Sequence, residues 1–88
     1  MRKACLSCIR KHLAQAMVLM DEAVLGYPVH KWLAIGHMAE AESEALEKYP
    51  EFSIHIRQLR IAYEEGDSIN LLPLIEYANT LEEDDNDD

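Results

Sequence analysis

Glycine and proline punctuate this 88-residue chain at a few places, and the stretches between them have the periodicity of helices. Gly26 supplies the left-handed position that ends a helix, and Pro28 prevents its continuation. Pro50 suits the first position of a new helix, and Gly66 closes that helix. Pro73 is tolerated only in the first turn of a last helix. The sequence therefore predicts helices over about 4–25, 30–48, 50–65 and from 67 or 68 to 81.

Apolar residues recur every three or four positions in each stretch, as on one face of a helix. The predicted core positions are Leu6, Ile9, Leu13, Ala16, Met17, Met20 and Val24, then Leu33, Ala34, Met38, Ala41 and Ala45, then Phe52, Ile56, Leu59 and Tyr63, and last Leu71, Leu72, Leu74, Ile75 and Ala78. We predict an all-α fold, a compact bundle of three to four antiparallel helices within residues 1–81. Ile54 and Ile61 lie off the third stripe, which suggests burial against a fourth element or a partner, and the partner could be a second copy of the chain.

The net charge of −9 is concentrated at the carboxyl end of the chain. Residues 82–88 hold six of the seventeen acids, which leaves residues 1–81 with eleven acids against eight basic residues, a net charge of −3. A block of like charge cannot bury anything, so we predict a disordered acidic tail over 82–88. The excess of acidic over basic residues disfavours nucleic-acid binding as a function. The sequence has no apolar run long enough to span a bilayer and no signal peptide, and it predicts a cytoplasmic protein.

Both cysteines and a histidine fall in one short motif, Cys5-x2-Cys8-x3-His12. Steps of three and four residues return to nearly the same side of a helix, so the three side chains project from one face. In a reducing cytosol, a close cysteine pair is typical of metal binding or redox chemistry rather than of a structural disulfide. The alternative is that two small buried residues and a histidine align without any such role.

Helix register provides a fourth ligand for a metal at this motif. If the first two helices form a hairpin about Tyr27, facing residues have numbers that sum to about 54, and the motif lies level with about residue 45. His37 is then roughly 11 Å away along the axis. A second turn about Pro50 places residue 45 level with His55, so we predict a closed Cys2His2 zinc site of Cys5, Cys8, His12 and His55. Glu44 and His37 are the alternative fourth ligands if the register slips by a turn.

A second candidate site surrounds the expected start of the second helix. Tyr27, His30, Lys31 and Trp32 form a potential aromatic and basic rim for a ligand or a partner side chain. We expect Trp32 to pack in the core and His30 to lie at the start of the helix. A small anionic ligand such as a signalling nucleotide, held by an oligomer, is the alternative use of this rim.

Two resemblances bear on function. The run Cys5-x2-Cys8-x3-His12-x3-Ala16 resembles the active-site motif of alkylhydroperoxidase D-like proteins, which are helical thiol oxidoreductases. This resemblance implies that Cys8 is the attacking thiolate, Cys5 the resolving thiol and His12 the proton relay. Only four residues precede Cys5, whereas those families place helices and a glutamate ahead of the motif.

The second resemblance covers more of the chain. Residues 5–16 and 26–41 are similar to small uncharacterised proteins encoded by tailed phages of gut bacteria. It implies a protein that acts by binding a host or defence component, or a virion accessory. The sequence thus favours a zinc-stapled, non-enzymatic binding module with an unidentified protein partner. The alternatives are a CxxC thiol oxidoreductase and an oligomer that sequesters a small anionic nucleotide.

Overall fold

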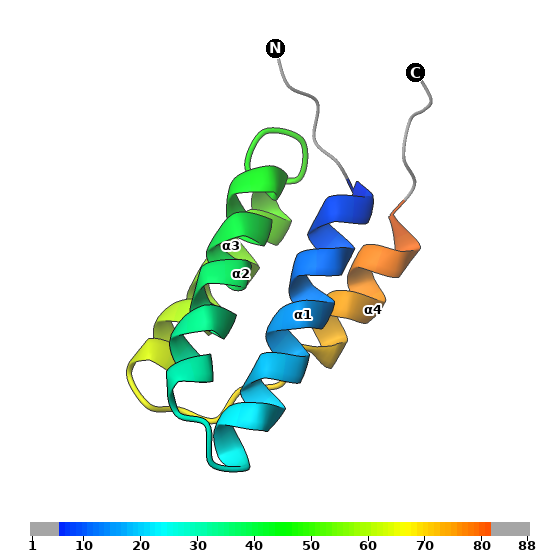
Figure 1. The fold of residues 1–88 in the computed structure, drawn as a ribbon. Helices are drawn as coiled ribbons and strands as arrows, with labels where there is room; N and C mark the ends of the chain where they lie inside the picture. Colours follow the sequence, from blue (N-terminus) through cyan, green and yellow to red (C-terminus); the bar gives the residue numbers. More distant parts are fainter. Residues whose placement is uncertain (1–5, 82–88) are drawn as a thin grey trace.

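Four helices make up the fold, and the all-α prediction is confirmed (Figure 1). The structure, a computed structural model, describes residues 6–81, and within this range it contains no strand. The helices are α1 (Leu6–Val24), α2 (Val29–Ala45), α3 (Pro50–Glu64) and α4 (Leu72–Thr80). The predicted acidic tail over 82–88 lies outside the described residues. None of the described helices combines the length and apolar character needed to cross a membrane.

Local backbone chemistry sets the end of α1 and both ends of α3 within one residue of the prediction, whereas α2 ends at Ala45 rather than at residue 48. Gly26 and Gly66 have φ angles of 120° and 103°, values that an L side chain rarely adopts. After Gly26, the Tyr27 N–H donates to the carbonyl of Glu22 at 3.2 Å and closes the last turn of α1. Pro50 stands in the first turn of α3, as predicted.

The fourth helix begins later than predicted, at Leu72 rather than at 67 or 68. Pro73 has no N–H and must stand in a first turn, so the helix starts immediately before it. The Asn70 side chain accepts a hydrogen bond from the Leu72 N–H at 3.0 Å and marks this start. Residues 67–71 form a connection without regular secondary structure instead of a helical turn.

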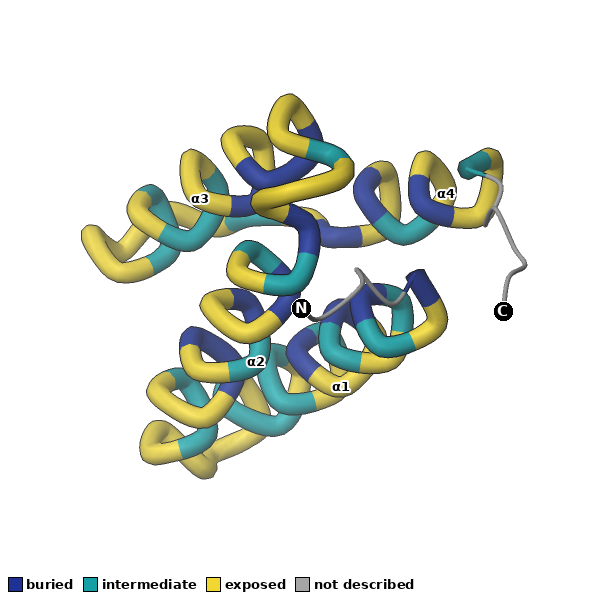
Figure 2. Tube along the Cα trace, turned by 90° about the horizontal axis from the view of Figure 1, so that it is seen from above, coloured by how far each residue is buried: buried dark blue, intermediate teal, exposed yellow. Residues whose placement is uncertain are grey.

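The helices pack in three antiparallel pairs around one core. The α1–α2 hairpin has the most extensive packing, α3 packs on α2, and the short α4 packs on α1 (Figures 1 and 2). Burial follows the inner faces of all four helices, and exposed residues lie on the outer faces (Figure 2). The start of α1 and the end of α4 lie at the same end of the bundle, while the α1–α2 connection lies at the opposite end (Figure 1).

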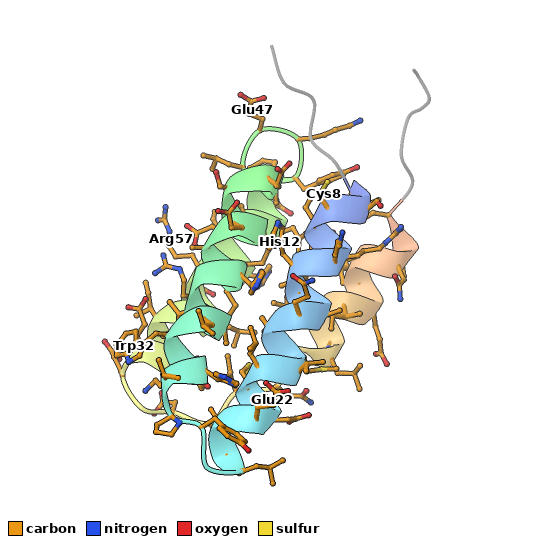
Figure 3. The ribbon with its side chains drawn as sticks, viewed as in Figure 1. Cys8, His12, Glu22, Trp32, Glu47 and Arg57 are labelled. Atoms are coloured by element: carbon orange, nitrogen blue, oxygen red, sulfur yellow. The ribbon has the colours of Figure 1, made fainter. Side chains whose placement is uncertain are left out.

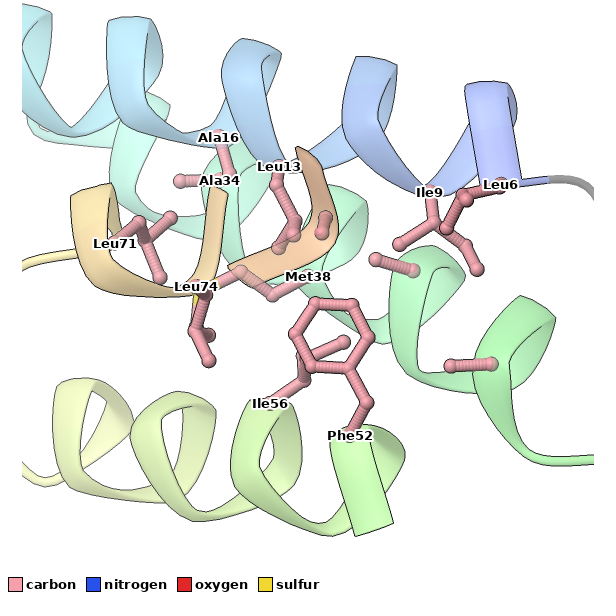
Figure 4. Close-up of a cluster of buried hydrophobic side chains, with 13 residues drawn as sticks. Leu6, Ile9, Leu13, Ala16, Ala34, Met38, Phe52, Ile56, Leu71 and Leu74 are labelled. Atoms are coloured by element: carbon pink, nitrogen blue, oxygen red, sulfur yellow. The ribbon is translucent and has the colours of Figure 1, made fainter. Parts of the chain in front are cut away.

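One contiguous core joins the helices (Figure 4). Four small residues, Ala16, Ala34, Ala41 and Ala45, are fully buried, and they let α1 and α2 approach closely. Phe52 is 1% exposed, and its ring meets the edge of Tyr77 with centroids 5.2 Å apart, so this contact links α3 to α4. The larger core side chains are Leu6, Ile9, Leu13, Met38, Phe52, Ile56, Leu71 and Leu74.

Polar contacts fix α3 on α2. The buried Ser53 hydroxyl donates to the carbonyl of Glu42 at 2.9 Å, and the Glu42 carboxylate accepts from Arg57 at 3.1 Å and from Arg60 at 3.0 Å. Arg60 also pairs with Glu64 at 2.9 Å. Burial opposes the charge on Arg60, but the hydrogen bonds from Glu42 and Glu64 outweigh it and raise the pKa of Arg60. This network orients α3 without adding apolar contact.

A single arginine connects α1 to the end of α4. The Arg10 guanidinium donates to the carbonyl of Ala78, from Nη2 at 3.1 Å and from Nε at 3.4 Å, and to that of Leu81 at 3.4 Å. The last turn of α4 contains no basic residue of its own. Arg10 therefore supplies the positive charge and the donors that a helix carboxyl end requires.

Several residues predicted to lie in the core lie on the surface instead. Val24 is 86% exposed, Leu33 51% and Leu72 45%, whereas Ile35, which the stripe omitted, is 8% exposed and buried. Leu33 and Val24 are at the edges of their predicted stripes, and the small bundle leaves those edges uncovered. Ile54 and Ile61 are exposed on α3, so within residues 6–81 no fourth element buries them.

Candidate functional site

The motif residues Cys8 and His12 lie on α1 near its amino end (Figure 3). Both are half-buried, and four residues, about one helical turn, separate them. Cys8 is disulfide-bonded. Cys5, the other cysteine of the chain, lies outside the described residues. The helix thus presents a sulfur and an imidazole on one face, as the spacing predicted.

His12 meets a second histidine across the α1–α2 interface. Its Nδ1 lies 3.0 Å from Nδ1 of His37 on α2, and the ring centroids are 5.2 Å apart with an interplanar angle of 35°. In such a pair one Nδ1–H donates and the other Nδ1 accepts. Both imidazoles are half-buried. The arrangement joins the two helices at the level of the cysteine motif.

This contact corrects the sequence register, which placed His37 roughly 11 Å from the motif. The connection after Gly26 runs back beside the last turn of α1 before α2 begins at Val29 (Figure 1). Facing residues therefore have numbers that sum to 49 at the His12–His37 contact, instead of about 54. The prediction treated the turn as symmetric, and its actual path shifts α2 by more than one helical turn.

The same shift removes His55 from the motif. His55 is exposed on α3, whereas its neighbours Ser53 and Ile56 are buried. Glu44, the other alternative ligand, is half-buried on α2 two turns beyond His37. Among residues 6–81, no three His, Cys, Asp or Glu side chains converge on one point as they stand. Of the predicted zinc ligands, Cys8 and His12 lie on one face of α1, His55 lies elsewhere on α3, and the alternative ligand His37 contacts His12.

A second feature lies at the other end of the bundle. Six large apolar side chains between residues 24 and 33 are at least half exposed, and we call this surface the apolar end. Its members are Val24 at 86%, Leu25 at 78%, Tyr27 at 58%, Val29 at 63%, Trp32 at 61% and Leu33 at 51%. They occupy the last residue of α1, the connection and the first turns of α2. Trp32 points outward from α2, so the expectation that it packs in the core is wrong (Figure 3).

The predicted aromatic and basic rim is assembled within this end. Tyr27 stacks on His30 with ring centroids 5.4 Å apart, and His30 Nδ1 lies 2.9 Å from a carboxylate oxygen of Glu22. That nitrogen is buried and makes no hydrogen bond of good geometry, so its contact with Glu22 is an ion pair only when His30 is protonated.

A cation–π contact extends the rim to α3. Lys31 Nζ lies 5.8 Å from the Trp32 ring centroid and 5.3 Å from that of Tyr63. Burial raises the pKa of the Tyr63 hydroxyl. The ammonium of Lys31 therefore bridges two aromatic rings from neighbouring helices.

The apolar end was not predicted from the stripes, although α2 carried a signal for it. Residues 32–35 are Trp, Leu, Ala and Ile in succession, and a single face of a helix cannot accommodate all four. Apolar residues on both sides of a helix indicate that both sides are covered. In the structure Ala34 and Ile35 face the core, and Trp32 and Leu33 do not.

Comparison with protein-family models, with curated proteins and with solved structures finds no match. The functional argument therefore rests on the two features described above, the cysteine and histidine cluster and the apolar end.

Proposed function

We propose that this protein is a non-enzymatic helical binding module that docks on a protein partner through its apolar end. The observation that carries the proposal is the set of six large apolar side chains exposed within ten residues of sequence. Isolated exposed apolar residues are ordinary, but a contiguous group of this kind marks an interaction surface. Tyr27 and Trp32 are residue types that supply most of the binding energy in protein interfaces.

Charge determines which kind of partner fits this surface. Asp21 and Glu22 border the apolar end at the last turns of α1. Two copies joined through this surface would bring these carboxylates close together, so self-association there is disfavoured. We infer a different protein as the partner, with an apolar patch bordered by basic side chains. A host or defence component bound by a phage protein is the case that the sequence resemblance suggests.

Site-specific photo-crosslinking in cells tests this proposal. A photoreactive phenylalanine analogue replaces Trp32 in one variant and Leu25 in a second, and replaces the exposed Gln58 of α3 in the matched control. We expect the first two variants to crosslink the same protein and the control not to. The crosslinked protein is then purified, and its affinity for wild type and Trp32→Ala is measured.

The outcomes of this experiment are distinct. Trp32→Ala is expected to raise the dissociation constant for the partner at least about tenfold, since central aromatic residues contribute ~2 kcal/mol or more to binding. Trp32 is 61% exposed, so its removal leaves the fold intact. Crosslinks from position 32 to a second copy of the chain would show that the surface binds another copy and not a different protein. Equal crosslinking from positions 32 and 58 would refute docking at the apolar end.

A thiol oxidoreductase is the second candidate, and the disulfide at Cys8 favours it. The His12–His37 pair gives the motif an imidazole that a second imidazole orients, as a proton relay requires. In a peroxidase cycle the two thiols reduce a hydroperoxide to an alcohol and water and become the disulfide, and an external dithiol reduces it again. Supplying cumene hydroperoxide and dithiothreitol tests this cycle. Hydroperoxide consumption that is abolished by Cys8→Ser and unchanged by His55→Ala supports the cycle. Hydroperoxide consumption no faster than with dithiothreitol alone refutes it.

A further inference from the structure

We propose that reduced Cys8, together with His12 and His37, forms a Zn²⁺ site, and that the disulfide at Cys8 is the metal-free state of the same site. The sequence predicted zinc at this motif with His55 as the ligand from another helix. The structure brings His37 to the motif and leaves His55 exposed on α3. The metal would thereby join α1 to α2, the pair of helices with the most extensive packing.

The geometry of the two imidazoles fits one metal ion. Zn²⁺ binds histidine nitrogens at about 2.0–2.1 Å, so two nitrogens in a tetrahedral site lie about 3.3–3.4 Å apart. The Nδ1 atoms of His12 and His37 are 3.0 Å apart and face each other. Widening this separation by about 0.3–0.4 Å lets a metal replace the shared proton. The imidazole that donates Nδ1–H then carries its proton on Nε2 instead.

Cys8 supplies the third ligand from the same helix as His12. Side chains four residues apart on a helix are neighbours, with Cβ atoms about 5–6 Å apart. A thiolate at 2.3 Å from zinc and an imidazole at about 2.1 Å span this separation. As long as Cys8 is disulfide-bonded, however, it has no thiolate to offer. The described residues then provide two nitrogen ligands at this point rather than three.

The site argued from the structure consists of Cys8, His12 and His37; the motif spacing predicts Cys5 as a fourth ligand, and Cys5 lies outside the described residues. A set of two cysteines and two histidines is a closed structural zinc site. Its formation from the oxidised chain requires a thiol reductant. Two molecules of a thiol such as glutathione reduce the disulfide to two thiols and become glutathione disulfide. Zn²⁺ then binds the two sulfurs as thiolates and releases two protons.

The surroundings of the cluster suit a structural site. Cys8, His12 and His37 are half-buried, and Leu13 and Met38, which follow the two histidines in sequence, are fully buried in the core. Partial burial at a helix interface limits the access of water to a bound metal. The cluster also lies away from the α1–α2 connection, so the metal and the apolar end are separate features (Figure 3). The zinc proposal therefore does not depend on the docking proposal.

Cobalt titration of the full chain tests the site, because tetrahedral Co²⁺ with thiolate ligands has a charge-transfer band and intense visible bands. The protein is reduced with a phosphine, freed of metal and titrated with Co²⁺, and Zn²⁺ is then added in competition. We expect one Co²⁺ per reduced chain, displacement by Zn²⁺, and no spectrum from the oxidised chain. His37→Ala is expected to weaken binding at least about tenfold, since the loss of even an indirect metal contact costs 10-fold to 100-fold.

Two controls keep the result interpretable. His55→Ala removes the exposed histidine of α3 and is expected to leave the Co²⁺ affinity unchanged. His37→Gln keeps the size of the side chain, and circular dichroism establishes that each variant is folded. A site that weakens with His55→Ala but not with either His37 variant would overturn the assignment. Absence of a thiolate–cobalt band in the reduced wild type, or equal affinity of the oxidised chain, would overturn the site itself.

Discussion

Arg10→Met is expected to weaken the attachment of α4 to the rest of the bundle. Methionine keeps most of the apolar stem of arginine and removes only the guanidinium, which donates to the carbonyls of Ala78 and Leu81. Those carbonyls belong to the last turn of a nine-residue helix that has no basic residue there. The substitution leaves them without a protein donor and removes the positive charge that balances the helix dipole.

The magnitude follows from the geometry of the three contacts. One donor distance is 3.1 Å, within the normal range, and the other two are 3.4 Å and therefore weak. A hydrogen bond to a charged group contributes about 1.5–3 kcal/mol, and a charge at a helix end about 0.3–1 kcal/mol at the surface. Because Arg10 is only half-buried, the lower values apply. We expect a loss of about 1–2 kcal/mol in the free energy of unfolding, or roughly 5–15 °C in Tm.

Urea unfolding monitored by circular dichroism measures this loss, and amide hydrogen exchange locates it. The matched control is Lys11→Met, which removes a charge from the exposed neighbouring position and is expected to change stability by less than about 0.5 kcal/mol. Protection should fall first at the amides of residues 72–81. Equal losses in the two variants, or a loss of protection spread evenly over all four helices, would refute the capping role of Arg10.

Three further substitutions test other parts of the fold. Gly36→Ala should stabilise α2 by about 0.5–1 kcal/mol in urea unfolding, because a Cβ at Gly36 meets nothing within 4 Å; a loss would show that the outer face of α2 is covered. Ser53→Ala should cost about 1 kcal/mol in the same assay, because a buried hydroxyl donates to the carbonyl of Glu42. Burial raises the pKa of Tyr63, so the neutral phenol stabilises the folded state below about pH 10, and this stability is lost as pH rises through the folded pKa. Thermal melts across this range should therefore fall less steeply for Tyr63→Phe, and identical slopes would contradict the shift.

The helix ends could be predicted because they depend on chemistry within a few residues. Gly26 and Gly66 adopt positive φ, and Pro50 and Pro73 stand in first turns, where their missing N–H costs nothing. Each of these requirements acts on the residue itself. The fold class followed from the same positions, since four amphipathic helices with short connections have few ways to bury one face each.

The pairing of His12 with His37 could not be predicted in this way. It depends on the path of the chain after Gly26, which runs back along α1 and shifts α2 by more than one turn (Figure 1). Turn residues fix the conformation of a connection, but the position of the next helix is set by how its side chains pack. Here the fully buried Ala16 and Ala34 allow a close approach that larger residues would prevent.

The α1–α2 hairpin carries both candidate sites, which lie at different places along it. The half-buried histidine pair lies across the α1–α2 interface, and the neighbouring Leu13 and Met38 are fully buried in the core. The apolar end lies at the connection, and Lys31 links it to Tyr63 of α3. Within residues 6–81, α3 and α4 pack on the hairpin and leave Trp32 and Leu33 exposed. A partner that binds there would complete the burial of α2, which is apolar on both sides.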